Sequence, residues 1–267
     1  MGKADWHQDF CADPFVFVYK GIPYLFYETL SAQRKGVLGC FSWTNGQWKQ
    51  LGLVLEEPWH LSYPQVFEDN GALYMIPESS AANEVMLYIS DAFPTGWQKR
   101  TTLLRGNYAD TTLLKWEGRY YLFAFCQDSV FPRLELWMSE DLLGPWSLHP
   151  QGKCLTSSPC LRRPAGSCFV EESHLWRVAQ DCDGGYGKRV FKVMIEELSP
   201  TVYREGGAFV LLDKRNPPHQ VGKHTFNRFE MNGVTYVAYD SKRRVLNPWK
   251  EILKTFSCYF VKMFRKR

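Results

Sequence analysis

The sequence predicts an all-β fold, a five-bladed β-propeller with a short C-terminal amphipathic helix. The first observation is an internal repeat, in which two apolar runs flank a polar turn. Its recurrence at intervals of about fifty residues is typical of a repeat architecture. The second observation is the strand chemistry of each copy, and the third is the room for further strands between copies. The copies begin at Asp13, Tyr63, Asp110 and Thr225, and a looser fifth copy begins at Ala165.

Each copy is predicted to be a β-hairpin. Its two runs are rich in Val, Phe, Tyr and Leu, and a turn containing glycine separates them. Runs such as 15–18 are apolar on both faces, so we expect inner strands that are covered on both sides. The turn glycines are Gly21, Gly71, Gly118 and Gly233, and Ser173 takes this place in the fifth copy.

Shorter strand-like runs lie between the hairpins, and each is followed by a turn and a further segment. With the hairpin, they make four strands per repeat, and five such units fit a five-bladed propeller. We therefore expect one propeller domain over residues 1–241. The shorter runs are 37–43, 85–90, 134–139 and 190–195.

The C-terminal segment, residues 242–267, differs from the propeller in charge and in periodicity. It contains nine basic residues and one acid, a net charge of +8, whereas residues 1–241 have 23 basic and 27 acidic residues, a net charge of −4. Asn247 and Pro248 are typical of a helix start, and apolar residues from Trp249 to Phe264 recur at helical spacing. This helix either packs on the propeller or lies on an anionic membrane surface.

Composition and charge exclude several functions. A mildly acidic propeller does not suit nucleic-acid binding. No transmembrane run or signal-peptide core is found, which predicts a cytoplasmic protein, with peripheral attachment at the inner face of the membrane through the basic tail. The eight cysteines lack zinc spacing and are expected to be mostly reduced thiols, with disulfides as the alternative. The six histidines are dispersed, so we predict no metal and no other cofactor.

The polar residues of the repeat are predicted to gather at one mouth of the propeller axis. The inner strands all run in the same direction, so their first residues meet there, and the residue fifteen positions later returns to the same face. Their carboxylates, cations and amides predict a site for a polar ligand. The alternative is that single acids form only turn hydrogen bonds or ion pairs. The candidates are Asp13, Glu28, Tyr63, Glu78, Asp110, Arg163, Gln180, Asp181, His224, Asn227 and Asp240.

Two sets of motifs resemble known families. The opening Ala12–Phe15, with a hairpin behind it, is similar to the first blade of the five-bladed family 43 glycosidases. The runs 61–71 and 75–79 resemble more closely the N-terminal propeller domain of glucosamine inositolphosphorylceramide transferases and similar stand-alone bacterial proteins. This resemblance covers residues 10–240. Further matching motifs are Arg163–Gly166, Gln180–Cys182 and His224–Asn227.

The glycosidase resemblance implies roles for three carboxylates. It implies that Asp13 is the general base and that Asp110 tunes the pKa of its neighbours. Glu78 is the best-placed general acid, with Glu28 as the alternative. Tyr63 stands where an acid is expected, which is a departure from the family pattern. In the plant transferases, the propeller is attached to a separate glycosyltransferase domain.

Two functions follow from this reasoning. The first is an enzyme that acts on a glycosidic bond, as a hydrolase or a transferase, in glycan or glycolipid metabolism. The second is a non-catalytic module that binds a carbohydrate or lipid-linked saccharide and presents it to a partner glycosyltransferase. In either case, Tyr63, Phe125 and Phe226 are expected to stack on sugar faces.

Overall fold

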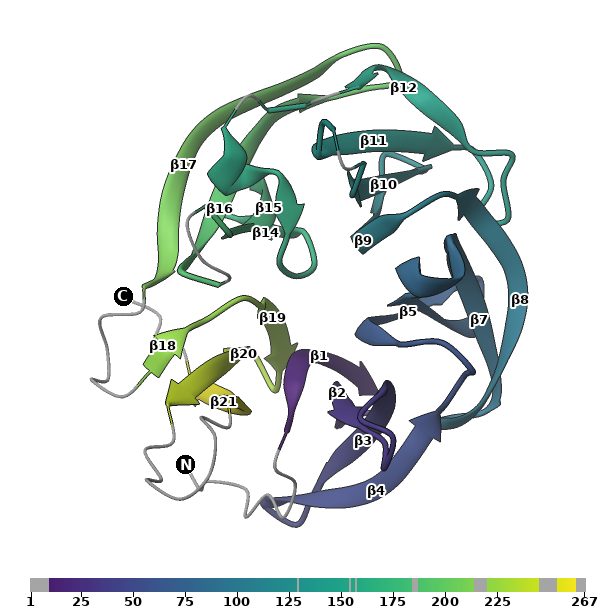
Figure 1. Ribbon diagram of the computed structural model, residues 1–267, viewed down its shortest axis with the longest axis vertical. Helices are drawn as coiled ribbons and strands as arrows, with labels where there is room; N and C mark the ends of the chain where they lie inside the picture. The colour runs from purple at the N-terminus through teal and green to yellow at the C-terminus, as the bar shows by residue number, and fades with distance from the viewer. Residues whose placement is uncertain are drawn as a thin grey trace.

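The protein is a β-propeller, as the sequence predicts. In the computed structural model, antiparallel sheets surround a central axis, and one edge of each sheet lies nearest to it (Figure 1). The described helical segments are two short 3-10 turns, η1 (Ser80–Ala82) and η2 (Pro159–Leu161). The structure describes residues 10–128, 130–153, 155–156, 158–183, 187–213, 220–244 and 254–262.

The first three sheets each contain four strands, which pair in chain order. The first sheet consists of β1 (Ala12–Tyr19), β2 (Ile22–Leu30), β3 (Gly36–Thr44) and β4 (Gln47–Leu55). The second consists of β5 (Ser62–Asp69), β6 (Ala72–Glu78), β7 (Glu84–Ala92) and β8 (Thr95–Arg105). The third consists of β9 (Tyr108–Trp116), β10 (Arg119–Cys126), β11 (Arg133–Ser139) and β12 (Ser147–Lys153).

The fourth and fifth sheets are less regular. In the fourth, two short strands take the inner position, and both pair with β15, which explains why its repeat copy is looser. Its strands are β13 (Arg163–Pro164), β14 (Phe169–Glu171), β15 (His174–Asp181), β16 (Arg189–Leu198) and β17 (Tyr203–Asp213). The strands of the fifth are β18 (Gln220–Gly222), β19 (Phe226–Met231), β20 (Val234–Arg244) and β21 (Lys254–Lys262).

The prediction of a C-terminal helix is wrong for Lys254–Lys262, which form the strand β21. This strand pairs antiparallel with β20 and extends the fifth sheet. Its sequence, KTFSCYFVK, is rich in β-branched and aromatic residues, which favour strands. The expected helix start at Asn247 and Pro248 lies outside the described residues.

The hydrophobic core lies between neighbouring sheets. Phe26 of the first sheet packs in one cluster with Met75 and Tyr88 of the second. Corresponding clusters join the second sheet to the third, the third to the fourth, and the fourth to the fifth. Strand β1 also contacts β19, which closes the ring between the first and fifth sheets.

Two observations bear on the predictions from composition. Within the described ranges, no helix is long and apolar enough to cross a membrane. Five cysteines of the described part of the chain form no disulfide in this structure. They are Cys40, Cys126, Cys160, Cys168 and Cys182.

Candidate functional site

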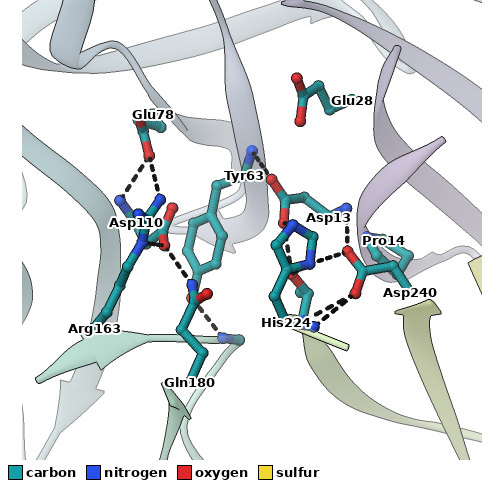
Figure 2. Close-up of polar contacts among 12 residues, drawn as sticks. Asp13, Pro14, Glu28, Tyr63, Glu78, Asp110, Arg163, Gln180, His224 and Asp240 are labelled. Atoms are coloured by element: carbon teal, nitrogen blue, oxygen red, sulfur yellow. Dashed lines mark hydrogen bonds and ion pairs between the residues drawn. The ribbon is translucent and has the colours of Figure 1, made fainter. Parts of the chain in front are cut away.

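The residues that open the first three sheets share an unusual backbone conformation. Asp13, Tyr63 and Asp110 have φ angles of 50°, 48° and 48°, a left-handed region that residues other than glycine rarely adopt. Each lies at a break in the pairing register of its hairpin, as in a β-bulge. Such a conformation costs about 1–3 kcal/mol and persists only where the surroundings hold it. The repeated bulge brings these three side chains together at the mouth (Figure 2).

Asp13 belongs to a buried group with Thr225, His224 and Asp240, which we call the histidine group. The Thr225 hydroxyl donates to Asp13 Oδ1 at 2.5 Å, and His224 Nε2 lies 3.6 Å from the same oxygen. His224 Nδ1 forms an ion pair with Asp240. Asp240 Oδ2 also accepts the Asp13 amide at 3.1 Å, and its Oδ1 accepts the amides of His224 and Thr225. Asp240 therefore holds the first and last blades together at the mouth.

The electrostatics of the histidine group favour a protonated His224. Burial alone would lower the pKa of His224, but the charges of Asp240 and Asp13 outweigh it and raise the pKa to about 9. Burial raises the pKa of Asp13 to about 7, although the charge of His224 acts against it. Asp13 is thus a carboxyl group that can exchange a proton near neutral pH, which suits a general base.

The histidine group is also where the described residues could hold a cation. Asp13, His224 and Asp240 each offer one ligand atom, and these atoms lie within 4.8 Å of one another. In the structure, the same atoms are joined by hydrogen bonds and ion pairs within the group. We therefore describe it as a proton-sharing group.

Glu78, Asp110, Arg163 and Gln180 form a second group, the arginine group. Asp110 Oδ2 accepts Arg163 Nε at 2.5 Å and Gln180 Nε2 at 2.8 Å. Glu78 Oε2 accepts the Asp110 amide at 3.1 Å, and Glu78 Oε1 accepts the Ser80 hydroxyl at 2.8 Å. Figure 2 shows the two groups on opposite sides of Tyr63.

The surroundings of Glu78 favour its protonated form. Burial and the adjacent Asp110 carboxylate raise the pKa of Glu78 well above 4.5, although Arg163 acts against them. A neutral carboxyl that keeps its proton at neutral pH can serve as a general acid. Asp110 is thus one of the groups that raise the pKa of Glu78.

A cavity of about 360 Å³ lies beside the arginine group. Its lining includes Phe125, Arg162, Arg163 and Cys182. The Arg163 guanidinium lies 6.0 Å from the centre of the Phe125 ring. Of the three aromatic residues expected to contact sugar, Phe125 is thus at a cavity, whereas Phe226 is only 5% exposed.

Tyr63 does not offer its ring to a ligand, contrary to our prediction. Its side chain is fully buried, and its hydroxyl lies 2.8 Å from Thr112 Oγ1 and accepts the Gly166 amide at 2.5 Å. The Tyr63 side chain therefore lies between the two groups, and its hydroxyl links the second sheet to the third and fourth. Its amide donates to Asp13 Oδ2 at 3.2 Å, so the residue supports the site through its backbone.

Asn227 and Asp181, two of the predicted ligand contacts, form hydrogen bonds to neighbouring strands in this structure. Asn227 Nδ2 donates to the Pro14 carbonyl at 2.8 Å, and Asn227 Oδ1 accepts the Ser167 amide at 2.8 Å. Asp181 Oδ2 accepts both Nε and Nη2 of Arg189, at 3.0 and 2.8 Å. Both side chains are buried, and these contacts bind neighbouring strands together.

Sequence reasoning missed His60, which contacts Glu28 at the mouth. His60 Nε2 lies 3.2 Å from Glu28 Oε1, and the His60 side chain is 43% exposed. Glu28 pairs across the first hairpin with Ala12, beside Asp13. His60 precedes the second repeat copy, so the alignment of the copies contained no signal for it.

Comparisons with known proteins agree with the sequence resemblance. The family model of the N-terminal region of glucosamine inositolphosphorylceramide transferase 1 matches residues 1–246. The Oryza sativa subsp. japonica protein of that name is 32% identical over 259 residues, which cover 94% of this chain and 34% of that protein. The Arabidopsis thaliana protein is 36% identical over 205 residues, 74% of this chain and 27% of that protein. The chain thus spans about a third of the length of these relatives.

Solved structures share the fold at low sequence identity. A thermostable family-43 glycoside hydrolase has a TM-score of 0.71 at 15% identity, with 96% of this chain and 90% of that chain covered. A family 43 β-xylosidase/α-arabinofuranosidase from a compost microbial metagenome, in complex with xylotriose, has a TM-score of 0.66 at 14% identity, covering 95% and 91%. These structures support the propeller architecture alone. Since the family model spans nearly the whole chain, the protein belongs to the family of the N-terminal region of glucosamine inositolphosphorylceramide transferase 1.

Proposed function

We propose that the chain binds a saccharide at the mouth and acts on a glycosidic bond. One observation carries this proposal: Glu78, whose pKa is raised, and Asp13, whose pKa is raised to about 7, lie on neighbouring blades on either side of Tyr63. Glycosidic chemistry requires two carboxyl groups, one that acts as the acid and one that acts as the base.

In this reaction, Glu78 donates its proton to the glycosidic oxygen as the bond from that oxygen to the anomeric carbon breaks. The attacking water, or a sugar hydroxyl in a transfer reaction, forms the new bond to the anomeric carbon and gives its proton to Asp13. Asp110, which Arg163 and Gln180 hold in place, favours the protonated form of Glu78.

A second function is a non-catalytic module that presents a saccharide to a glycosyltransferase. The observation in its favour is length, since the matched region is only 34% of the rice relative, and the transfer chemistry of that protein can reside elsewhere. Under this alternative, the same mouth binds the sugar, and the partner carries out the transfer.

Two isosteric variants separate these functions. The test measures binding and hydrolysis of a panel of oligosaccharides and aryl glycosides by wild type, Asp13→Asn and Glu78→Gln. The enzyme proposal predicts that both variants bind saccharide but lose turnover by at least about a hundredfold. Binding by wild type without turnover of any panel member would favour the presenting module. No binding by wild type would refute both.

Attachment to an anionic membrane is a separate proposal that now rests on charge alone. The strand β21 replaces part of the helix that suggested it. The remaining support is the charge of residues 242–267, which contain nine basic residues and one acid. Co-sedimentation with anionic vesicles at low salt tests it, and protein that stays in the supernatant would refute both the attachment and the position at the inner face of the membrane.

A further inference from the structure

Glu28 and Asp110 differ from the other carboxylates of the mouth, because each has only one oxygen that a described donor contacts. Asp13, Glu78 and Asp240 each have both carboxylate oxygens engaged by protein donors. Glu28 contacts His60 through Oε1, and within the described part of the chain no donor reaches its Oε2. An oxygen of this kind can accept a hydrogen bond from a ligand, because a carboxylate has acceptor capacity for several donors.

The position of His60 is determined by the backbone around it. The Gly36 amide donates to His60 Nδ1 at 3.0 Å, and the Leu61 amide donates to the Gly36 carbonyl at 3.0 Å. A Cβ atom at Gly36 would lie 2.5 Å from His60 Cε1 and 2.5 Å from the Leu61 carbonyl oxygen. Glycine at this position therefore allows the imidazole to pack directly against the start of β3.

These contacts define the state of the imidazole. Since Nδ1 accepts the Gly36 amide, the proton of the neutral ring is on Nε2, which faces Glu28 Oε1. Charged residues of the adjoining segments contact partners of their own. Lys35 contacts the Glu57 carbonyl and lies 3.4 Å from Glu56, and Glu57 accepts the Tyr88 hydroxyl.

We propose that Glu28 and His60 form a subsite that binds a saccharide hydroxyl group at the edge of the mouth. His60 is the positioning residue: it donates to Glu28 Oε1 and so directs Oε2 toward the ligand. The Glu28 side chain is 9% exposed and that of His60 is 43% exposed, so the pair connects the buried Asp13 region with the surface. This inference rests on the proposed saccharide site, and adds to it the contact that selects a hydroxyl at one position of the sugar.

The ligand class follows from the chemistry of the pair. A carboxylate oxygen repels anions, so the group that it accepts is a neutral or positively charged donor. A sugar hydroxyl is such a donor, and a hydrogen bond to a charged acceptor contributes about 1.5–3 kcal/mol, which corresponds to about tenfold or more in affinity.

The test is calorimetric titration of wild type and variants with xylotriose, cellotriose and glucosamine. His60→Ala and Glu28→Gln should each weaken the binding of the preferred sugar about tenfold. The double variant should bind no more weakly than Glu28→Gln, because the two residues act through one hydrogen bond. His60→Gln, which can still donate to Glu28, should stay within about threefold of wild type. The matched control is Glu230→Gln, at a glutamate in β19 whose side chain is 65% exposed, which should leave affinity unchanged.

The outcomes separate this inference from the proposed function. If wild type binds one of the three sugars and His60→Ala binds it equally well, the subsite is refuted while the saccharide site stands. The same conclusion follows if His60→Gln loses as much affinity as His60→Ala, since a positioning role requires rescue. If wild type binds none of these sugars at any concentration tested, the saccharide site fails and the subsite fails with it. Long-range proton–nitrogen NMR gives an independent check, because a proton on His60 Nδ1 in the neutral ring would contradict the proposed geometry.

Discussion

Replacement of Asp240 by Asn tests whether charge holds the histidine group together. Asp240 is fully buried, and it accepts three backbone amides as well as His224 Nδ1. Asn has almost the same shape, but it removes the negative charge and turns one acceptor into a donor that faces other donors. Loss of one partner of a buried ion pair costs about 3–5 kcal/mol, because the other charge remains buried without compensation. We expect the free energy of unfolding to fall by this amount.

The pH dependence of the same variant has a defined sign. The pKa of His224 is raised from 6.5 to about 9 in the folded protein, a difference that corresponds to about 3 kcal/mol of stability. Because the folded pKa is the higher one, this stabilisation is complete below about pH 6.5 and is lost as the pH rises through about 9. Asp240→Asn removes the largest favourable charge, so its stability should vary much less than that of wild type over this range.

Guanidinium unfolding at about pH 6 and about pH 9 measures both effects. Glu230→Gln is the control, since the Glu230 side chain is 65% exposed in the same sheet and its loss should change stability by less than about 0.5 kcal/mol. Equal unfolding midpoints for wild type and Asp240→Asn would refute the reasoning. So would parallel pH dependences, since they would mean that Asp240 does not raise the pKa of His224.

Three further predictions concern other parts of the site. Tyr63→Phe should destabilise the protein by about 1–3 kcal/mol in thermal unfolding, because the buried Gly166 amide loses its acceptor; an unchanged melting temperature would contradict the structural role of Tyr63. Gly36→Ala should cost about 1–3 kcal/mol, because its Cβ would lie 2.5 Å from the Leu61 carbonyl oxygen; chemical denaturation checks this, and wild-type stability would show that the segment moves freely. Glu78→Gln should lose activity on substrates with poor leaving groups more than on aryl glycosides with good ones; equal losses would argue against Glu78 as the acid.

The sequence repeat predicted correctly which residues occupy equivalent positions in the sheets, but it did not predict where their side chains point. Asp13, Tyr63 and Asp110 share both their place in the repeat and their left-handed backbone conformation. The alignment had no means of showing that the Tyr63 ring packs inward, because that depends on Thr112 and Gly166 from two other sheets. For Gln180 and Asp181 the signal was present, since successive residues of a strand face opposite sides and only one can point to the arginine group.

His60 and the C-terminal strand show two other limits of prediction from this sequence. His60 lies outside the aligned copies, and its contact with Gly36 joins residues 24 positions apart. In the C-terminal segment, Phe256 and Phe260 are four residues apart, a spacing that fits a helix but also fits the alternating pattern of a strand. Pairing with β20 stabilises the strand, and because this pairing is a tertiary contact, the local sequence pattern does not reveal it.

A crystal structure with the preferred saccharide tests the central claim, that the mouth is the ligand site, most directly. We predict a sugar ring between Asp13 and Glu78, with one hydroxyl donating to Glu28 Oε2. A groove of about 580 Å³, lined in part by Trp116, His174 and Glu196, offers the ligand another place to bind. A sugar bound there, with the mouth empty, would contradict the account.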